Sequence, residues 1–200
     1  MHRYNTISLI EVDMRRRAAR TAALASGPLH VEPYESVAEF LANGNTETLI
    51  VVRDEGQNIT DLLQDMRSRS YWAPILGYRK NPDIIRCSQL IVKGLTGYLP
   101  EPFDQSDIQT LFEGCAAELT SLINSRFAAA EARNKLNQLT PREKQVLDRL
   151  KDGLSNPEIA EVLNISSRTV EIHRGHLLHK LEAKNAAAAV HMTAQALMTG

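Results

Sequence analysis

The apolar residues of this 200-residue chain change their period near residue 136, and this change constrains the fold more than any other feature. Over the first 120 residues, short apolar runs alternate with stretches of helical period. The runs expected to form buried strands are Ile7–Ile10, Leu29–Val31, Leu49–Val52, Pro74–Leu76 and Thr96–Leu99. The helical stretches lie around Arg15–Ala25, Ser36–Leu41, Ile59–Met66 and Ile84–Val92. This alternation predicts an α/β domain over residues 1–120, built on a five-stranded, doubly wound parallel sheet.

A long amphipathic helix is expected to follow this domain. From Asp104 to Leu136, apolar residues recur at three- and four-residue steps, and Gly114 is the one Gly or Pro in the stretch. Beyond about Leu122 the helix outruns a domain of this size, so its apolar stripe needs another surface. We expect a partner helix from a second chain there, with docking onto the C-terminal domain as the alternative within one chain. Residues 121–136 are therefore assigned to a helical linker.

Residues 137–200 are expected to form an all-helical domain of four short helices. The first has a clear start signal, because Thr140 suits the N-cap, Pro141 the first helical position, and Glu143 completes a capping box. Gly153 is expected to end it. The other three are expected to start at the cap Asn156 before Pro157, to run from Ser166 or Ser167 to about Leu181, and to cover Asn185–Met198.

The second and third of these helices are joined only by Asn164-Ile165-Ser166, and the small Ala160 lies on the inner face of the first of the pair. This is the spacing of a helix-turn-helix, whose second helix enters the major groove of DNA. The wider pattern is Leu139-Thr140-x-Arg142-Glu143-x-x-Val146-Leu147, Gly153-x-Ser155-Asn156-x-Glu158-Ile159-Ala160-x-x-Leu163-x-Ile165-Ser166-x-x-Thr169-Val170, then His173 and Lys180-Leu181. It resembles the LuxR-type helix-turn-helix, which implies a DNA-binding transcription regulator.

The net charge of −1 gives no overall attraction for DNA, so binding needs a local excess of positive charge. The third helix of the domain supplies one. The residues expected to position phosphates are Arg168, Arg174, Lys180, Ser155, Asn156, Ser167 and Thr169. The resemblance places Glu171, Ile172 and Gly175 toward base edges, where Glu171 suits cytosine N4 and Ile172 a thymine methyl. Family members often carry a basic residue at Glu171 and Gly175, a departure that concerns affinity more than fold.

Three histidines on the same helix, His173, His176 and His179, have helical spacing that imitates a metal site. No carboxylate or Cys stands at the matching turn, so no metal is expected. His173 is as compatible with a core or capping position as with a DNA contact. The isolated Cys87 and Cys115 give neither a disulfide framework nor a zinc site. They are expected to fill apolar space, with redox control of assembly as the alternative.

The N-terminal domain resembles the receiver domain of response regulators. The residues that carry this resemblance are Leu9-Ile10-Glu11-Val12-Asp13, Ser36-Val37-Ala38-Glu39-Phe40-Leu41, Gly94 and Pro102-Phe103. A working receiver needs an acidic pair for Mg²⁺, a phosphoacceptor Asp after strand three, a Ser or Thr after strand four and a Lys after strand five. The resemblance therefore implies that these four positions decide how the domain is controlled.

All of these positions depart from the family pattern. Arg53 ends the third strand with Asp54 one place along, Gly77-Tyr78-Arg79 falls at the Ser/Thr position, and Glu101 replaces the Lys. The acidic pair survives only as Glu11 and Asp13. We predict that Arg53 and Arg79 balance Glu11, Asp13 and Glu101 by direct ion pairs, without Mg²⁺. The domain would then be a pseudo-receiver that does not need phosphorylation. A one-residue slip that makes Asp54 the phosphoacceptor is the alternative.

The sequence thus predicts a homodimeric, sequence-specific DNA-binding transcription regulator of the cytoplasm. Its expected partners are double-stranded DNA, with half-sites about 10 bp apart, and RNA polymerase. No cofactor is expected. No membrane contact is expected either, because the longest apolar stretches, such as Ala186–Met192, fall short of the roughly 18 to 20 residues of a membrane span. No enzyme is expected either, for want of a nucleophile triad or phosphate loop. The alternative is an interaction protein that titrates another regulator or kinase. Trp72, Tyr78 and Tyr98 are expected in the core, with a small-molecule site as the alternative.

Overall fold

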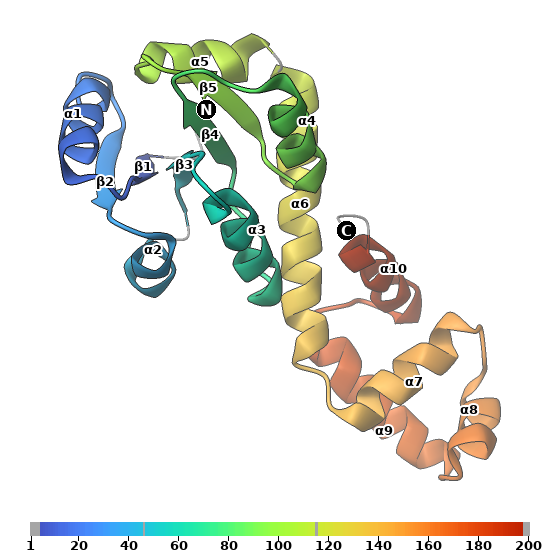
Figure 1. Ribbon diagram of the computed structural model, residues 1–200. Helices are drawn as coiled ribbons and strands as arrows, with labels where there is room; N and C mark the ends of the chain where they lie inside the picture. The colour runs from blue at the N-terminus through green and yellow to red at the C-terminus, as the bar shows by residue number, and fades with distance from the viewer. Residues whose placement is uncertain (1–4, 46, 115, 198–200) are drawn as a thin grey trace. The chain divides into compact units, whose positions relative to one another are not determined.

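The computed structural model describes residues 5–45, 47–114 and 116–197. The chain divides into two compact units, one up to Asn124 and one from Ser125 onward. The first contains the five strands of the described chain, and the second is built from helices (Figure 1). The division falls inside the segment 121–136 that the sequence assigns to a linker.

A five-stranded parallel sheet forms the centre of the first unit, in the order β2-β1-β3-β4-β5. Its strands are β1 (Thr6–Ile10), β2 (His30–Tyr34), β3 (Leu49–Arg53), β4 (Ile75–Arg79) and β5 (Gly97–Pro100). The chain adds strands in opposite directions on the two sides of β1, so the predicted doubly wound sheet is confirmed. Strand β4 runs to Arg79, beyond the predicted end at Leu76, because Tyr78 and Arg79 pair with Leu99 and Pro100.

A helix follows each strand in the chain. These helices are α1 (Met14–Leu24), α2 (Val37–Asn43), α3 (Asn58–Ser68), α4 (Ile84–Lys93) and α5 (Gln105–Gly114). Their starts are set locally, since the side chains of Asp13, Ser36 and Asp83 each accept a hydrogen bond from the first turn of α1, α2 and α4. The core contains Ile50, Val52, Ile59, Leu62 and Ile75, all with at most 1% exposure. These helices confirm the predicted α/β alternation.

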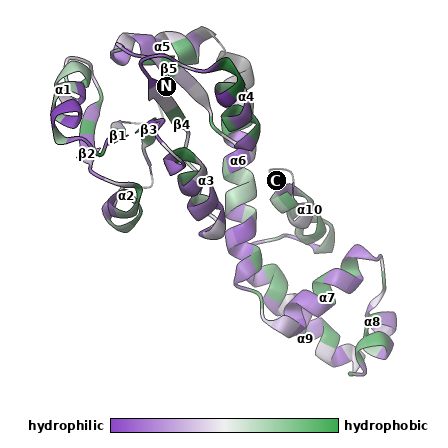
Figure 2. Cartoon of the chain, in the orientation of Figure 1, coloured by the Kyte–Doolittle hydropathy of each residue, from purple (hydrophilic) through white to green (hydrophobic). Residues whose placement is uncertain are grey.

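Helix α4 differs from the others in its outer surface. Ile84, Ile85, Ile91 and Val92 are exposed by 82%, 71%, 44% and 84%, and only Leu90 of this helix is buried. Figure 2 shows the strongly hydrophobic residues on α4 beside hydrophilic ones. In the described ranges, none of the helices combines the length and the apolar character needed to cross a bilayer.

Helix is described on both sides of Cys115, as α5 and as α6 (Ala116–Asn137). Cys115 itself lies outside the described residues, so one continuous helix over Asp104–Leu136 and a redox role for Cys115 stay predictions. The end of α6 packs within its own chain: Leu136 contacts the core of the second unit, and the Arg133 Nη1 donates to the Ala196 carbonyl at 3.1 Å. Docking within the chain, the second alternative for this helix, is what these contacts support.

The second unit contains the four expected helices, α7 (Pro141–Lys151), α8 (Asn156–Leu163), α9 (Ser167–Lys180) and α10 (Ala186–Leu197). Its core includes Val146, Ile159, Val170, Leu177 and Leu181, all fully buried. The capping box of Thr140 and Glu143 at the start of α7 is confirmed. Gly153, at φ +81°, follows the end of that helix, as expected.

The start of α8 differs from the prediction. Ser155, not Asn156, is the N-cap, and the Glu158 carboxylate accepts from the Ser155 N–H at 2.7 Å and from its hydroxyl at 2.6 Å. Ser155 has the extended backbone of an N-cap, whereas Asn156 is already helical. At α9 the structure selects Ser166, whose Oγ accepts from the Thr169 N–H at 3.0 Å.

Gln105 provides a stability test of the first unit. Its buried carboxamide donates to the Leu24 carbonyl at 2.6 Å and the Leu29 carbonyl at 2.9 Å, and accepts from the Leu29 N–H at 3.0 Å. Gln105→Ala leaves these backbone groups without partners, and we expect a loss of roughly 2 to 4 kcal/mol in the free energy of unfolding. Urea unfolding followed by Trp72 fluorescence measures it.

The matched control is Gln109→Ala on the same helix, where the exposed side chain donates to Glu113 Oε1 at 2.6 Å. We expect this variant to change the free energy by less than about 0.5 kcal/mol. Equal losses in the two variants would contradict the role assigned to Gln105.

Candidate nucleic-acid interface and charged pocket

Helices α8 and α9 form a helix-turn-helix, as the sequence predicts. They are joined by residues 164–166, and Asn164 has the left-handed backbone, with φ 52° and ψ 52°, that turns the chain between them. The Ile165 N–H closes the turn by donating to the Ala160 carbonyl at 3.0 Å. Ala160 is buried, and its small side chain lets the two helices approach each other.

One face of α9 is exposed along its length. Its residues are Arg168, Glu171, Ile172, Gly175, His176 and His179. They recur at three- and four-residue steps, while Val170 and Leu177 on the opposite face are buried. The three residues expected to face bases therefore lie together on a solvent-facing surface. Arg168 is the one Arg or Lys among them, its side chain is 81% exposed, and its Nη1 lies 2.9 Å from Glu171 Oε2.

Several of the predicted phosphate contacts are bonded within the unit. The Lys180 Nζ lies 2.8 Å from Glu143 Oε2, and the Glu143 side chain is only 4% exposed. The Arg174 Nη1 donates to the Asn156 side-chain oxygen and so links α9 to the start of α8. The Ser155 hydroxyl is bonded to Glu158. The contacts of Lys180 and Arg174 join residues 37 and 18 positions apart, so they depend on helix packing. The Ser155–Glu158 contact is local and has the S-x-x-E spacing of a capping box, a signal that the prediction of Asn156 as the cap missed.

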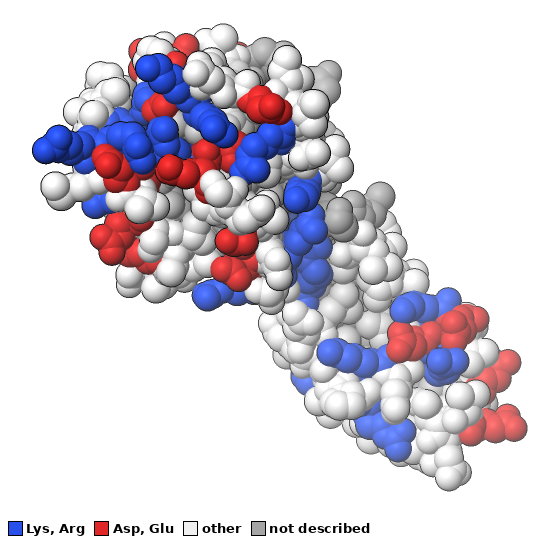
Figure 3. Space-filling view, in the orientation of Figure 1, with Lys and Arg blue, Asp and Glu red and all other residues white. Residues whose placement is uncertain are grey.

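The remaining positions at the helix start are more open. Ser167 is exposed, and the hydroxyls of Thr169 and Ser166 lie 2.8 Å apart. His173 is half-buried, whereas His176 and His179 are exposed. In the part of the chain that the structure describes, no group of three or more His, Cys, Asp or Glu side chains is arranged to hold a metal ion. On the face that Figure 3 shows, basic and acidic side chains of the second unit are interspersed.

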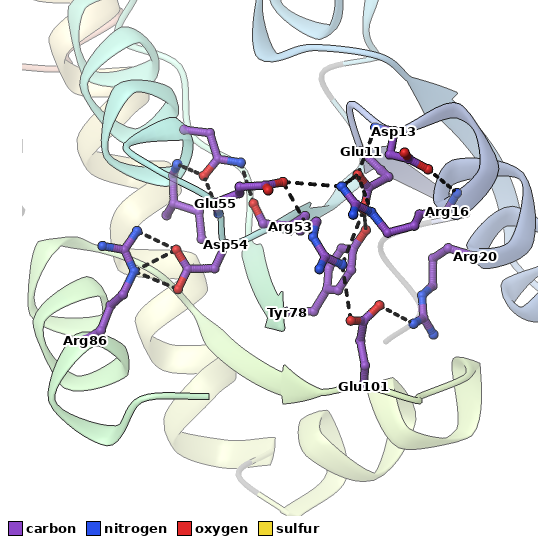
Figure 4. Close-up of polar contacts among 12 residues, drawn as sticks. Glu11, Asp13, Arg16, Arg20, Arg53, Asp54, Glu55, Tyr78, Arg86 and Glu101 are labelled. Atoms are coloured by element: carbon purple, nitrogen blue, oxygen red, sulfur yellow. Dashed lines mark hydrogen bonds and ion pairs between the residues drawn. The ribbon is translucent and has the colours of Figure 1, made fainter. Parts of the chain in front are cut away.

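A cluster of charged side chains, called the charged pocket below, lies in the first unit at the edge where the carboxyl ends of the parallel strands meet (Figure 4). Glu11 follows β1, Arg53 ends β3 and Glu101 follows β5. The Arg53 Nη1 lies 3.2 Å from Glu101 Oε2 and 3.6 Å from Glu11 Oε2. Its Nε lies 3.6 Å from Glu55 Oε2. The predicted ion pairs of Arg53 with Glu11 and Glu101 are therefore present.

The Glu11 side chain is fully buried, and both of its carboxylate oxygens accept hydrogen bonds from the protein. The Tyr78 hydroxyl donates to Oε2 at 3.0 Å, and the Arg16 Nε and Nη2 lie 3.3 Å from Oε1. The Asp13 N–H also donates to Oε1, at 3.0 Å. Burial, and then the neighbouring Glu11 carboxylate, raise the pKa of Tyr78, so this hydroxyl keeps its proton and remains a donor. Glu11 is thus neutralised by groups of the chain itself.

Arg20 of α1 is a further member of the pocket. Its Nη2 lies 2.7 Å from Glu101 Oε1, and its Nη1 donates to the Phe103 carbonyl at 2.8 Å. The guanidinium also lies over the Phe103 ring, 4.1 Å from its centroid. Burial of Arg53 alone would lower its pKa, but the charges of Glu101 and Glu11 raise it above the ordinary value. Arg53 is thus held in its charged form.

Two predicted members of these ion pairs lie elsewhere. The exposed Asp13 caps α1, with its carboxylate accepting from the Arg16 N–H at 2.8 Å. Arg79 is exposed at the end of β4, whereas its neighbour Tyr78 points into the pocket. Successive residues of a strand point to opposite faces, so only one of the two can reach Glu11. This corrects the expectation that Asp13 and Arg79 join Arg53, Glu11 and Glu101.

The same alternation separates Asp54 from Arg53, and Figure 4 shows Asp54 turned toward α4. Arg86 of α4 donates to the buried Asp54 carboxylate through Nε, 2.8 Å from both oxygens, and through Nη2 at 2.5 Å. The Tyr98 hydroxyl donates to Oδ2 at 2.8 Å. Burial alone would raise the pKa of Asp54, but the Arg86 and Tyr98 donors hold it below the ordinary value of 3.8. Asp54 is therefore an ionised, fully bonded carboxylate.

Cys87, beside Arg86, is half-buried. Its burial, and then the nearby Asp54 and Asp83 carboxylates, raise the pKa of the thiol above the ordinary value of 9.0. Oxidation proceeds through the thiolate, so these surroundings oppose the redox role considered for Cys87.

A sheet of receiver topology together with a helix-turn-helix unit defines a DNA-binding transcription regulator with the architecture of a response regulator. Residues 137–193 match the family model of bacterial regulatory proteins of the luxR family. The chain is 27% identical over 191 residues to the transcriptional regulatory protein TdiR of Thauera aromatica, covering 94% of this chain and 84% of TdiR. It is 28% identical over 204 residues to FixJ of Azorhizobium caulinodans, covering 97% and 92%.

The structure of full-length FixJ from B. japonicum is similar as well. The match covers 98% of both chains, with a TM-score of 0.50 and 25% identity. The chain therefore carries a LuxR-type helix-turn-helix domain and is homologous to response regulators of the FixJ and TdiR type. Both resemblances drawn from the sequence are confirmed at this level.

The ion pair of Glu143 and Lys180 predicts a pH-dependent contribution to stability. Burial would raise the pKa of Glu143, but donors from Lys180 and Thr140 lower it below 4.5. The contribution is therefore present above about pH 4.5 and is lost as the pH falls through the folded-state pKa. We expect Lys180→Met to lower the stability of the second unit by about 1 kcal/mol near pH 7, allowing for the partial exposure of Lys180. Hydrogen exchange of α7 and α9 amides in the full chain measures it.

Lys151→Met is the matched control, because the Lys151 Nζ pairs with the half-exposed Asp148 at 2.8 Å. We expect this variant to change the hydrogen exchange of the α7 and α9 amides little near pH 7. If Lys180→Met changed the exchange as little as Lys151→Met does, the stabilising role assigned to the Lys180–Glu143 ion pair would be contradicted.

Proposed function

We propose that this chain is a homodimeric, sequence-specific DNA-binding transcription regulator whose receiver-like domain works without phosphorylation. The observation that carries the proposal is Arg53 at the end of β3, ion-paired with Glu101 and Glu11. The receiver resemblance implies an Asp at the position of Arg53 and a Lys at the position of Glu101. The chain carries the same kind of ion pair with its charges exchanged.

The exchange removes the chemistry of phosphoryl transfer from this position. A guanidinium has no nucleophilic oxygen, and it stays protonated in proteins. A phosphoryl group placed nearby would add negative charge beside Glu11 and Glu101. The Lys that would balance this charge in a working receiver is absent from its position, where Glu101 stands. The pocket therefore supports a domain that is not phosphorylated.

The pocket also does not fit Mg²⁺. This ion needs carboxylate oxygens and water in near-ideal octahedral geometry. Here both oxygens of Glu11 accept hydrogen bonds, and the Arg53 Nη1 lies 3.6 Å from Oε2. The second acidic residue, Asp13, accepts from the first turn of α1 instead. A cation at Glu11 would have to displace Arg16, Arg53 and Tyr78.

Asp54 does not offer a way around this. As a phosphoacceptor it would need a free oxygen open to solvent, yet it is 3% exposed and accepts from Arg86 and Tyr98 on both oxygens. Phosphorylation would break those bonds inside the protein. We therefore favour the charge-balanced pocket over the one-residue slip.

The DNA-binding half of the proposal rests on the exposed face of α9. We propose that Glu171 accepts from cytosine N4, that Ile172 contacts a thymine methyl and that Gly175 permits close approach to the groove. Arg168, Ser167 and Thr169 would contact phosphates near the start of α9, where the helix dipole favours anions. Arg174 would contact a phosphate from the middle of α9, beside the start of α8. RNA polymerase is the partner expected of a regulator bound at a promoter.

The homodimer rests on the exposed face of α4. Ile84, Ile85 and Val92 form an uncharged apolar surface on this helix, with Ser88 and Gln89 between them. A large exposed apolar surface marks an interaction site. A two-fold dimer places the same patch on both copies, and an uncharged patch meets its own copy without repulsion. Two copies would present two α9 helices to successive half-sites.

Independence from phosphorylation is tested on the full chain by its affinity for DNA. We expect the dissociation constant for its operator, found by selection from random duplexes, to stay within twofold with or without acetyl phosphate and Mg²⁺. The reason is that neither Arg53 nor Asp54 offers an acceptor. A large gain in affinity with acetyl phosphate would contradict the proposal. No binding to any duplex would favour the interaction protein that titrates another regulator.

Contacts to phosphates and to bases should separate in a salt titration. Arg168→Ala is expected to weaken binding to all duplexes and to reduce the slope of log K against log salt by about 1. Glu171→Ala is expected to change base preference by roughly 1 to 3 kcal/mol at one position of the operator. Lys151→Ala on α7 is the control. An unchanged slope for Arg168→Ala would count against the docking of α9.

A further inference from the structure

Helix α4 has few anchors for a helix of ten residues. Leu90, the seventh of these ten residues, is its one buried side chain, so buried apolar packing lies in the second half of the helix. At its far end the Arg67 Nη2 of α3 donates to the Lys93 carbonyl at 2.8 Å. At its start the anchor is Arg86, which reaches Asp54 after β3 and donates to the Gly56 carbonyl at 2.7 Å. The placement of the first turn of α4 therefore depends on Arg86.

Asp54 connects three elements at this point. It follows β3, accepts from Arg86 of α4 and accepts from Tyr98 of β5. The planar guanidinium meets the carboxylate through two nitrogens, which fixes direction as well as distance. Because Asp54 is buried, water competes little for these bonds. We call Asp54, Arg86 and Tyr98 the α4 clamp.

We propose that the α4 clamp holds α4 in the position from which its apolar face pairs with the same face of a second copy. Asp54, which the alternative would make the phosphoacceptor, is then a permanent positioning residue. This inference rests on the homodimer proposed above. It adds that the dimer needs no chemical signal, because the bonds that hold α4 are made within the unmodified chain.

The arrangement of charge on α4 points to a second copy as the occupant. Arg86, the one charged residue within the helix before Lys93, turns inward to Asp54. The outward residues Ile84, Ile85, Ser88 and Val92 carry no charge. A highly charged partner would lose its hydration against this face without gaining an ion pair. An identical uncharged face has no charged groups whose hydration would be lost on pairing.

The experiment measures the dimer dissociation constant of the full chain by sedimentation, and hydrogen exchange of the α4 amides in the same samples. Asp54→Asn and Arg86→Gln are expected to raise the dissociation constant at least tenfold and to speed exchange in α4. Tyr98→Phe, which removes one hydroxyl and no charge, is expected to have a smaller effect of the same kind. Arg86→Lys restores the charge and is expected to recover part of the affinity.

Two controls keep the outcome specific. Asp61→Asn and Arg15→Gln remove exposed charges of the same unit and are expected to change neither reading. Val92→Glu places a charge on the face itself and is expected to give monomers without faster exchange in α4. A wild-type dimer that Asp54→Asn, Arg86→Gln and Tyr98→Phe all leave intact would overturn this inference alone. A wild-type chain that is monomeric at every concentration would overturn the proposed homodimer and this inference with it.

Discussion

A carboxylate with no exposure to solvent, Glu11 at the end of β1, sets a requirement that the rest of the pocket meets. An isolated charge at such a place costs far more than the fold can offset, so it needs donors and opposite charge. Tyr78, Arg16 and Arg53 supply them from β4, α1 and β3. Each of these partners is fixed in turn by its own strand or helix. Charge balance is therefore built into the sheet edge where a receiver would hold its cation.

The alternation of side chains along a strand divides the work between two neighbours. Arg53 faces Glu11 and Glu101, whereas Asp54, one residue on, faces α4. Arg53 thus balances the carboxylates of the pocket, and Asp54 holds α4, the helix that bears the exposed apolar surface. The two groups of ion pairs share a single stretch of backbone, so the phosphorylation independence proposed for the pocket and the proposed placement of α4 have a common structural origin. This link makes a domain regulated by assembly physically coherent.

Much of this could be predicted from the sequence, because local signals set it. Apolar period placed the strands and helices, the Thr140 and Glu143 capping box marked α7, and the helix-turn-helix pattern identified the second unit. The exchanged charges at Arg53 and Glu101 were also predicted by position.

Arg20, Arg86 and Tyr98 were missed, since their bonds span 81, 32 and 44 residues and depend on which strands lie side by side. The arginine-rich start of α1, next to the end of β1, was the one signal that could have pointed to Arg16 and Arg20. The internal bonds of Lys180 and Arg174 were missed for the same reason, because they depend on helix packing.

The proposals above depend most on a receiver-like domain that has no available phosphoacceptor. The most direct measurement is the intact mass of the full chain after incubation with acetyl phosphate and Mg²⁺, followed by peptide mapping after rapid acid quenching. We expect an unmodified mass for this chain, and we expect a homologous receiver that carries a phosphoacceptor Asp to become phosphorylated in the same reaction. One phosphoryl group on Asp54 would contradict this expectation.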